Sequence, residues 1–366
     1  MSNGVGPVLE KFPDVRRIAV LRGGGLGDLL FAYPALDALA SAYPGADITL
    51  LGTPLHAELL RNRPGPVQHV EVLPYAPGVR PGEEDPAATA EFVERMRAQS
   101  FDLAVQIHGG GRNSNPFLLA LGARHTVGTR TPDAPALNRN LPYIYYQNEF
   151  LRALEVVGLS GAAPVSLEPR FTVTEDEKAA GLRLAGRRAR PLVVIHPGAT
   201  DPRRRWPTSS FAAVAAMAAR DGNDVVVVGD DSDLPAAQEI LERAEEPDRI
   251  RSLAGQLSLS ELAGVLSVAS VVVGNDSGPR HLAQAVGTPT VGVYWAGNVI
   301  SAGAMGRMLH RVHIAWVIEC PVCGVDVTQV GWTAERCEHD ESFVQQIHPD
   351  AVYADVRELA LHKGQD

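Results

Sequence analysis

Cysteine is scarce in this sequence, which has three thiols in 366 residues. So few thiols over such a length exclude a disulfide-stabilised secreted scaffold and fit a reducing cytoplasm. Basic residues are outnumbered as well, with 33 Lys and Arg against 43 Asp and Glu and a formal net charge of −10. This balance argues against broad electrostatic binding of nucleic acid or anionic lipid, so we expect no nucleic-acid partner.

Long apolar runs are missing too. No run reaches the roughly 18 residues that a membrane-spanning helix requires, and residues 1–17 lack the apolar core of a secretory signal. We therefore expect a cytoplasmic protein whose contact with the inner face of the plasma membrane is at most peripheral. What is present is an ordinary globular composition, 45% hydrophobic and 21% charged, over a length that suggests two domains.

Short apolar runs alternate with helical patterns along the chain. RIAVLR at 17–22 has the pattern of a buried strand and is followed by apolar residues at helical spacing. The same alternation restarts with PLVVIHPG at 191–198. Alternating strands and helices predict right-handed crossovers and parallel sheets covered on both faces. The predicted fold class is therefore α/β, with two Rossmann-like domains.

A stretch rich in Pro, Ser and charged residues at 160–178 separates the two alternating halves, and we place the domain boundary there. Because ligands bind at the carboxyl ends of parallel strands, a cleft is expected between the domains. The predicted organisation is an N-terminal domain at 1–165, a linker at 166–190, a C-terminal domain at 191–348 and a closing helix at 349–366.

The first candidate for a phosphate site is GNDSGPRHLAQA at 274–285. A strand runs here directly into a helix, so the backbone N–H groups after Asp276 and the helix dipole would favour an anion. Gly278 would let a phosphate approach the backbone closely. The alternative is an ordinary helix capped by Ser277 or Asp276.

Two further loops follow strands in the C-terminal half. HPGATDPRRRWP at 196–207 holds three arginines, which suit phosphate, although a solvated charge run is the alternative. GDDSDL at 229–234 contains an Asp-x-Asp pattern that a ribose hydroxyl or a metal could use, but an acidic helix start is the commoner explanation. Because no second acidic cluster is evident, we expect no magnesium site there.

The glycine-rich loop RGGGLGD at 22–28 does not have the dinucleotide-binding pattern G-x-G-x-x-G. No acidic residue follows the second predicted strand either, which argues against a nicotinamide-dependent dehydrogenase. Asp28 stands at the start of a helix, where a carboxylate is stabilised in its charged form. It is either a helix cap or a general base that takes a proton from a sugar hydroxyl.

A set of zinc-ligand residue types, C-x2-C followed by C-x-H, lies near the C-terminus. One close pair with a more distant cysteine and histidine is a weaker pattern than two close pairs. Reduced free thiols are therefore the favoured interpretation, and no metal is expected. The residues concerned are Cys320, Cys323, Cys337 and His339.

In their order along the chain, these motifs resemble glycosyltransferase family 9, the heptosyltransferases of bacterial surface-polysaccharide assembly. The similarity covers most of the sequence and includes the Gly-Asp turn at 27–28, FDLAVQIHGGGR at 101–112, the RWP element at 205–207, the block at 253–294 and the CPVC tail. The resemblance implies a GT-B architecture, in which the N-terminal domain binds the acceptor and the C-terminal domain binds the nucleotide sugar.

The resemblance also implies a reaction. It is the inverting, metal-independent transfer of a sugar, in this family most often a heptose from ADP-heptose, to a lipopolysaccharide-type glycan. No cofactor beyond the nucleotide-sugar donor is implied. The partners are then a nucleotide sugar and a glycan or glycolipid acceptor.

Individual residues follow from the same resemblance. Asp28 matches the family's catalytic base, and Arg204 matches a lysine that meets the donor diphosphate, so charge is kept there but geometry is not. The implied donor-binding residues are Gly198, Arg204, Asp233, Leu257, Asp276, Ser277, Gly278 and His281. Apart from the resemblance, Gly24 and Gly25 are acceptor-side candidates because they leave space at the cleft. The basic residues expected near the cleft either meet an anionic acceptor or are ordinary surface residues, and they are Arg61, Arg63 and Arg112.

Arg280 departs from the family pattern, in which an apolar residue is common, and is expected to place a cation near the phosphates or the acceptor. Two alternatives to transfer stay open. One is an epimerase of the same architecture, which would act on the donor alone. The other is a non-catalytic nucleotide-sugar-binding protein, in which Asp28 would be a helix cap.

Overall fold

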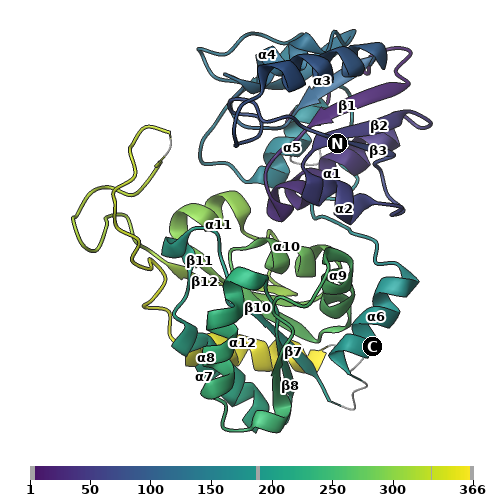
Figure 1. Ribbon diagram of the computed structural model, residues 1–366. Coiled ribbons are helices and arrows are strands. Elements are labelled where there is room, and N and C mark those ends of the chain that lie inside the picture. The colour runs from purple at the N-terminus through teal and green to yellow at the C-terminus, as the bar shows by residue number, and fades with distance from the viewer. Residues whose placement is uncertain (1–4, 187–189, 331, 363–366) are drawn as a thin grey trace. The chain divides into compact units, whose positions relative to one another are not determined.

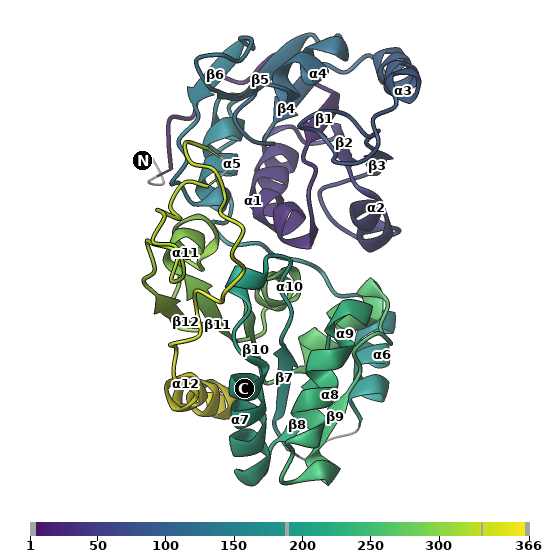
Figure 2. The same ribbon diagram turned by 60° about the vertical axis from the view of Figure 1, so that its left-hand side comes forward.

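The computed structural model describes residues 5–186, 190–330 and 332–362, and the chain divides into two compact units, Met1–Thr172 and Val173–Asp366. We call these the N-terminal and the C-terminal unit. Each is built on one six-stranded sheet whose neighbouring strands run parallel (Figure 1, Figure 2). The α/β fold class predicted from the alternation of strands and helices is confirmed.

The sheet of the N-terminal unit has the strand order β3-β2-β1-β4-β5-β6, so the direction of winding reverses between β1 and β4. Loops after the two strands at such a switch point are where open α/β sheets bind ligands. The strands are β1 (Arg17–Leu21), β2 (Asp47–Gly52), β3 (His69–Val72), β4 (Leu103–Gln106), β5 (His125–Arg130) and β6 (Arg139–Pro142), and the helices are α1 (Leu26–Ala42), α2 (Pro54–Leu60), α3 (Pro86–Ala98), α4 (Ser114–Ala120) and α5 (Glu149–Gly158).

Helices cover both faces of this sheet, which is why its central strands are apolar throughout. Helices α1 and α5 pack together on one face, where the rings of Phe31 and Phe150 meet edge to face at 5.0 Å (Figure 1). Helices α3 and α4 lie on the other face, where Phe92 and Phe117 stack at 5.8 Å over the strands. The core therefore holds the loops after β1 and β4 on a rigid support.

The C-terminal unit repeats the same topology, with the order β12-β11-β10-β7-β8-β9 and a switch point between β7 and β10. Its strands are β7 (Leu192–His196), β8 (Asp224–Val227), β9 (Ile250–Ser252), β10 (Val271–Asn275), β11 (Thr290–Trp295) and β12 (His310–Ala315), and its helices are α6 (Glu175–Ala185), α7 (Thr208–Arg220), α8 (Leu234–Glu242), α9 (Leu259–Val268), α10 (Gly278–Ala285), α11 (Ala296–Ala302) and α12 (Pro349–His362).

Part of the predicted linker is a helix of the C-terminal unit. The division at 172/173 falls inside the predicted linker 166–190, but residues 175–185 form α6, which packs closely on α9. The approach is backbone to backbone, because a Cβ on Gly181 would lie 2.2 Å from the carbonyl oxygen of Gly264. Two glycines at the crossing thus let α6 dock where larger residues would hold it away.

A long segment without helices or strands connects β12 to α12 at residues 316–348, of which the structure describes all but residue 331. The last helix then closes the C-terminal unit, where Val352 and Leu359 are fully buried in the core beside Phe211 of α7. Among the described residues, no helix is both long and apolar enough to cross a membrane.

The carboxyl of Asp37 in α1 is half-buried, and its contribution to the stability of the fold depends on pH. Burial raises the pKa of its carboxyl to about 6, against the opposing charge of Arg170. A raised folded-state pKa means that this acid stabilises the fold below pH 4 and loses that contribution as pH rises to about 6. Asp37→Asn should therefore raise the free energy of unfolding at pH 7.5 by about 1 kcal/mol, which is less than the full pKa shift implies because solvent screens a half-exposed group. Calorimetry at pH 4 should show no gain.

Candidate active site

The turn between β10 and α10 lies at the switch point of the C-terminal sheet, where Gly274 of β10 pairs with His196 of β7. No described residue accepts a hydrogen bond from the backbone N–H groups of Ser277 or Gly278. The side chain of Ser277 instead faces His196, with Oγ and Nδ1 3.0 Å apart. Free N–H groups at the start of α10 suit an anion, which is the chemistry that the sequence predicts here.

Asp276 is the centre of a buried hydrogen-bond network behind this turn, with its side chain only 4% exposed. Its Oδ2 accepts from Arg204 Nη1 at 3.1 Å and Asn298 Nδ2 at 2.8 Å, and its Oδ1 accepts from His281 Nε2 at 2.9 Å. Burial alone would raise the pKa of Asp276, but the hydrogen bond from His281 and the charges of His281, Arg204 and Arg280 lower it to about 2. The ionised carboxylate therefore holds three side chains in place at physiological pH.

Arg280 lies in the first turn of α10 and is closed off from solvent. It is completely buried, with its guanidinium 5.2 Å from the ring centroid of Tyr294, and it donates to Nδ1 of His281. Because a guanidinium can only donate, we assign the ring proton of His281 to Nε2, which donates to Asp276. The expected cation therefore lies close to the turn, where its charge helps to lower the pKa of Asp276, but burial makes Arg280 a support for His281 and leaves it no exposed surface for a ligand.

The three arginines of the loop after β7 have different environments. Arg203 is buried and paired with Asp201 at 2.6 Å. Arg205 is exposed and donates to the loop backbone. Arg204 is 26% exposed and reaches Asp276. Of the three, Arg204 therefore combines a fixed position beside the turn with a surface that an anion can contact.

Asn275 is a positioning residue that the sequence analysis did not single out. Fully buried at the end of β10, it accepts the backbone N–H of Trp206 on Oδ1 at 3.0 Å and donates from Nδ2 to the carbonyl oxygen of Pro197 at 2.7 Å. It thereby fastens the arginine loop to the turn. The signal was a polar residue at the end of an otherwise apolar strand.

The predicted nucleotide-binding residues Gly198 and Asp233 are in contact. A Cβ would lie 2.2 Å from Asp233 Oδ1 if built on Gly198, and 2.5 Å from Oδ2 if built on Gly229. Asp233 is 8% exposed, and Oδ2 accepts the N–H of Asp230 at 3.1 Å and lies 3.4 Å from His196 Nε2. Burial alone would raise the pKa of Asp233. The hydrogen bond and charge interaction with His196, together with the hydrogen bond from the N–H of Asp230, outweigh burial and lower the pKa.

Leu257 lies half-buried just before α9, in the loop that follows β9. That loop is joined to the one after β8, because the N–H of Gly255 donates to the carbonyl oxygen of Gly229 at 3.0 Å. All the predicted donor-side residues thus lie in loops at the carboxyl edge of the C-terminal sheet, or in the first turn and a half of α10 that follows one of them.

Asp28 occupies the equivalent position in the N-terminal unit, after β1 and in the first turn of α1. Its Oδ2 accepts the N–H of Gly25 at 2.8 Å, and its Oδ1 accepts from Arg22 Nη2 at 2.7 Å. Arg22 is itself buried and also contacts Glu149 at 3.3 Å. The Asp28 side chain nevertheless stays 43% exposed. It is both a helix cap and an oriented, accessible carboxylate.

Burial and paired charges set the electrostatics around Asp28. Burial alone would lower the pKa of Arg22, but the carboxylates of Asp28 and Glu149 outweigh it and raise the pKa, so the guanidinium is permanently charged. Burial and the Arg22 charge lower the pKa of His108 to about 4, so this histidine is neutral and its Nδ1 accepts the N–H of Gly23 at 3.2 Å. The sequence analysis did not identify Arg22 or His108 as site residues.

The opening glycines are explained by their contacts with these side chains. Gly24 has a φ of +91°, and a Cβ there would lie 2.3 Å from Asp28 Oδ2. A Cβ on Gly23 would lie 2.7 Å from the carbonyl oxygen of Val79. Gly25 is exposed and supplies the N–H that Asp28 accepts. The glycines of this loop therefore make room for the Asp28 carboxylate itself.

Gly24→Ala should lower the free energy of unfolding by about 2 kcal/mol, through positive-φ strain and the clash with Asp28. Gly45→Ala is the matched control, because Gly45 has a φ of +83° but no atom within 4 Å of its Cβ position. The control should cost about half as much. Thermal unfolding followed by circular dichroism measures both, and equal losses would show that the Asp28 contact costs nothing.

The basic acceptor-side candidates divide by burial. Arg63 is buried, stacks on Phe171 at 4.1 Å and donates to the Leu59 carbonyl oxygen at 2.9 Å, so its expected role in acceptor binding is wrong. Arg61 is exposed at the end of α2, and Arg112 is 78% exposed with Asp133 at 3.5 Å. These two remain accessible to an anionic acceptor.

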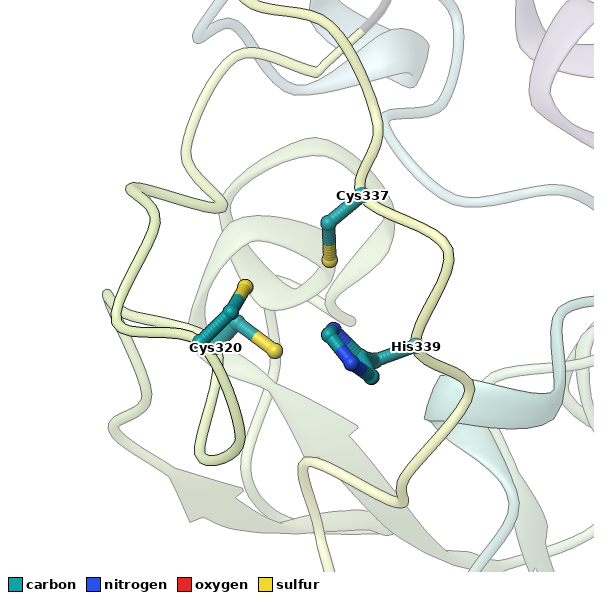
Figure 3. Close-up of side chains that lie close together, drawn as sticks. Cys320, Cys337 and His339 are labelled. Carbon is teal, nitrogen blue, oxygen red and sulfur yellow. The ribbon is translucent and has the colours of Figure 1, made fainter.

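The three cysteines of the 316–348 segment lie close to His339, although the sequence spacing favoured free thiols. One ligand atom from each of four residues lies within 4.8 Å of every other. Figure 3 shows Cys320, Cys337 and His339 pointing toward one another from separate stretches of the segment. The loop folds back on itself, so the distance along the chain between the close pair and the later ligands does not separate them in space.

Residues 89–320, more than half of the chain, match the family model "Glycosyltransferase family 9 (heptosyltransferase)". The chain belongs to glycosyltransferase family 9. This membership makes it a glycosyltransferase and confirms the family resemblance found in its motifs.

Curated relatives agree with the family. Lipooligosaccharide heptosyltransferase 2 of Haemophilus influenzae is 24% identical over 294 residues, covering 76% of this chain and 82% of the relative. Lipopolysaccharide heptosyltransferase 2 of Salmonella typhimurium is 34% identical over 204 residues, covering 54% of this chain and 55% of the relative.

Solved structures of the family share the fold. A family 9 glycosyltransferase from Veillonella parvula has a TM-score of 0.77 at 19% identity, covering 97% of this chain and 100% of that one. The ADP-heptose lipopolysaccharide heptosyltransferase II of Escherichia coli has a TM-score of 0.72 at 20% identity, covering 95% and 99%. The GT-B architecture of this glycosyltransferase, with one Rossmann-like sheet in each unit, is thereby confirmed.

Within this glycosyltransferase, the two switch points offer complementary chemistry. The C-terminal one presents backbone N–H groups and Arg204, which can stabilise negative charge on a departing diphosphate. The N-terminal one presents Asp28, an oriented carboxylate that can accept a proton.

Proposed function

We propose that this protein transfers a heptose from ADP-heptose to a hydroxyl group of a lipopolysaccharide-type acceptor, with inversion at the anomeric carbon and without a metal ion at the reacting centre. The observation that carries the proposal is the turn at 275–278, where free backbone N–H groups adjoin Arg204, held by the buried Asp276 carboxylate. The names of the relatives support heptose as the sugar and lipopolysaccharide as the acceptor class.

The donor side of the reaction concerns the leaving group. As the bond between the anomeric carbon and the diphosphate oxygen breaks, the electron pair and a growing negative charge go to ADP. The N–H groups of Ser277 and Gly278 and the guanidinium of Arg204 are fixed before this charge develops, because Asp276 and Asn275 hold them. Preorganised donors of this kind stabilise the transition state without costly reorganisation.

The acceptor side concerns the proton. As the acceptor oxygen bonds to the anomeric carbon, its proton passes to the Asp28 carboxylate. Arg22 and the Gly25 N–H fix the orientation of that carboxylate, while its exposed part remains open to a hydroxyl. Attack from the face opposite to the leaving diphosphate gives inversion. We place the reaction at the cytoplasmic side of the membrane, where nucleotide sugars are made.

The test is product analysis with defined donors and acceptors. We expect ADP to be released from ADP-heptose only when a lipopolysaccharide core acceptor is added, with an α-linkage formed from a β-linked donor by NMR. ADP, more than UDP or GDP, should raise the melting temperature, because a ligand that binds only the folded state stabilises it. Conversion of the donor without acceptor would replace the proposal by an epimerase, and stabilisation by UDP alone would overturn the choice of donor.

A further inference from the structure

The segment at 316–348 contains a turn that presents two sulfur atoms on one side. The N–H of Cys320 donates to the carbonyl oxygen of Val325 at 2.8 Å, and the N–H of Gly324 donates back to the carbonyl oxygen of Cys320 at 2.9 Å. Gly324 has a φ of +72°, a left-handed conformation that glycine adopts without strain. Such a turn holds Cys320 and Cys323 as neighbours.

Two further ligand atoms approach this pair from the other end of the segment. Cys337 and His339 follow fourteen and sixteen residues after Cys323, yet the four ligand atoms all lie within 4.8 Å of one another (Figure 3). The Nδ1 atom of His339 is buried and has no hydrogen-bond partner among the described residues. A buried imidazole nitrogen without a partner is costly, and a metal ion would satisfy it.

We propose that Cys320, Cys323, Cys337 and His339 bind one soft transition-metal ion, with zinc as the expected occupant. Three thiolates and an imidazole form a complete tetrahedral ligand set that zinc prefers. Zinc–sulfur bonds of about 2.3 Å place tetrahedral sulfur atoms about 3.8 Å apart, a spacing that the gathered side chains reach with small adjustments. The thiols give up their protons to solvent on binding.

The site is structural, because four protein ligands leave no coordination position for a substrate. The proposal replaces the free thiols favoured by the sequence spacing with metal ligands, and it places no metal at the reacting centre. The segment has little else to hold it: its apolar cluster contains Cys320, Val327 and Phe343, while Trp316 is 72% exposed. A metal that joins the two ends of a poorly packed loop adds the stability that a small core lacks.

The same segment supports the arginine loop of the donor side. Beyond His339, the N–H of Phe343 donates to the carbonyl oxygen of Arg203 at 2.8 Å, and Ser342 Oγ donates to that of Arg205 at 2.6 Å. These two bonds flank Arg204. Metal binding therefore stabilises the backbone that positions Arg204. The effect of this on donor binding rests on the proposed function, whereas the metal site itself does not.

The experiment measures metal in the full-length protein, purified without a histidine tag from zinc-supplemented medium. Plasma mass spectrometry should find about one zinc per chain, and Cys323→Ser and His339→Ala should each reduce this at least tenfold. His348→Ala is the matched control, since His348 lies in the same segment with a 72% exposed side chain and should keep the metal. Cobalt should give the intense visible absorption of a tetrahedral thiolate complex.

Tryptophan fluorescence supplies a second measurement that does not require a variant to fold. All four tryptophans report on this segment: Trp316 and Trp332 lie in it, Trp206 Nε1 donates to Ile347 at 3.0 Å, and Trp295 Nε1 donates to Val317 at 2.5 Å. Removing the metal from the wild-type protein with a strong chelator should change the emission and expose residues 316–348 to protease. Adding zinc back should reverse both changes.

Each other outcome decides against part of the proposal. Stoichiometric iron lost in the same variants would keep the site and overturn the choice of zinc. Metal-free protein with three freely titrating thiols, or with a disulfide among them, would overturn the site. A metal-free protein that transfers heptose would leave the proposed reaction standing, and a zinc-loaded protein that does not would remove only that reaction.

Discussion

Asp28→Asn should lower the turnover number for sugar transfer by about 10³-fold, with little change in ADP affinity. The amide oxygen can still accept a hydrogen bond from Gly25 N–H or Arg22, so the helix cap and the loop should survive. What is lost is the negative charge that takes the proton from the acceptor hydroxyl. Initial rates at saturating donor and acceptor measure the first quantity, and titration calorimetry with ADP measures the second.

Asp85→Asn is a matched control for this change, because Asp85 is an exposed N-cap of α3 in the same unit and asparagine caps equally well. It should retain wild-type turnover. If the Asp28→Asn variant transfers sugar at more than a third of the wild-type rate, Asp28 is not the catalytic base. Loss of ADP affinity or of melting temperature in step with activity would mean that Asp28 acts as a structural cap.

Arg204→Ala should weaken ADP binding by about 100-fold, since a charge-assisted hydrogen bond contributes about 1.5–3 kcal/mol. The guanidinium is held by Asp276 and partly exposed, so it is already oriented before the diphosphate arrives. Turnover should fall as well, because charge on the leaving group grows in the transition state. Calorimetry with ADP and with AMP separates the contribution of the second phosphate.

Arg205→Ala is the control for the loss of a charge from the same loop. Arg205 is exposed, its Nε donates to the carbonyl oxygen of Ala199 at 2.7 Å, and it does not pair with Asp276. It should bind ADP within twofold of the wild type. Equal losses in the two variants would show that the loop acts through its summed charge, and Arg204→Lys, which keeps charge but not the planar fork, should fall between.

The sheets were predictable because apolar runs report burial directly. RIAVLR and SVVVG are strands because both faces of the sheet are covered, and their sequences are apolar for the same reason. Helix α6 was missed because its charged start resembles a linker. The signal was present, since Thr174 and Glu177 form a capping box in which each side chain bonds the other's backbone N–H.

The candidate site was predictable where a motif carries it and not where contacts between distant residues make it. The turn at 276–278 and Asp28 were found from local pattern and family resemblance. Arg22 reaches the carbonyl oxygen of Ile107, 85 residues away, and Asn275 reaches Trp206 across 69 residues. No local spacing encodes such pairs. A local sequence pattern does not show which side chains become buried either, which is why Arg280 was expected to place its cation near a ligand. For the same reason as with the distant pairs, Cys337 was not expected beside Cys320.

The repeated strand order has a consequence for which half of the molecule can take an anion. Both units start a helix at the same topological position, but in the first the N–H of Gly25 is already bonded to Asp28, an acidic side chain of the chain itself. In the second, the N–H groups of Ser277 and Gly278 have no such partner among the described residues. In the N-terminal unit, the start of the helix is thus bonded to a carboxylate of the chain itself. In the C-terminal unit, it is open to an anion from solution. At the first position the Asp28 carboxylate occupies an N–H group that an anion would use, whereas at the second the N–H groups of Ser277 and Gly278 and the partly exposed Arg204 are available to one.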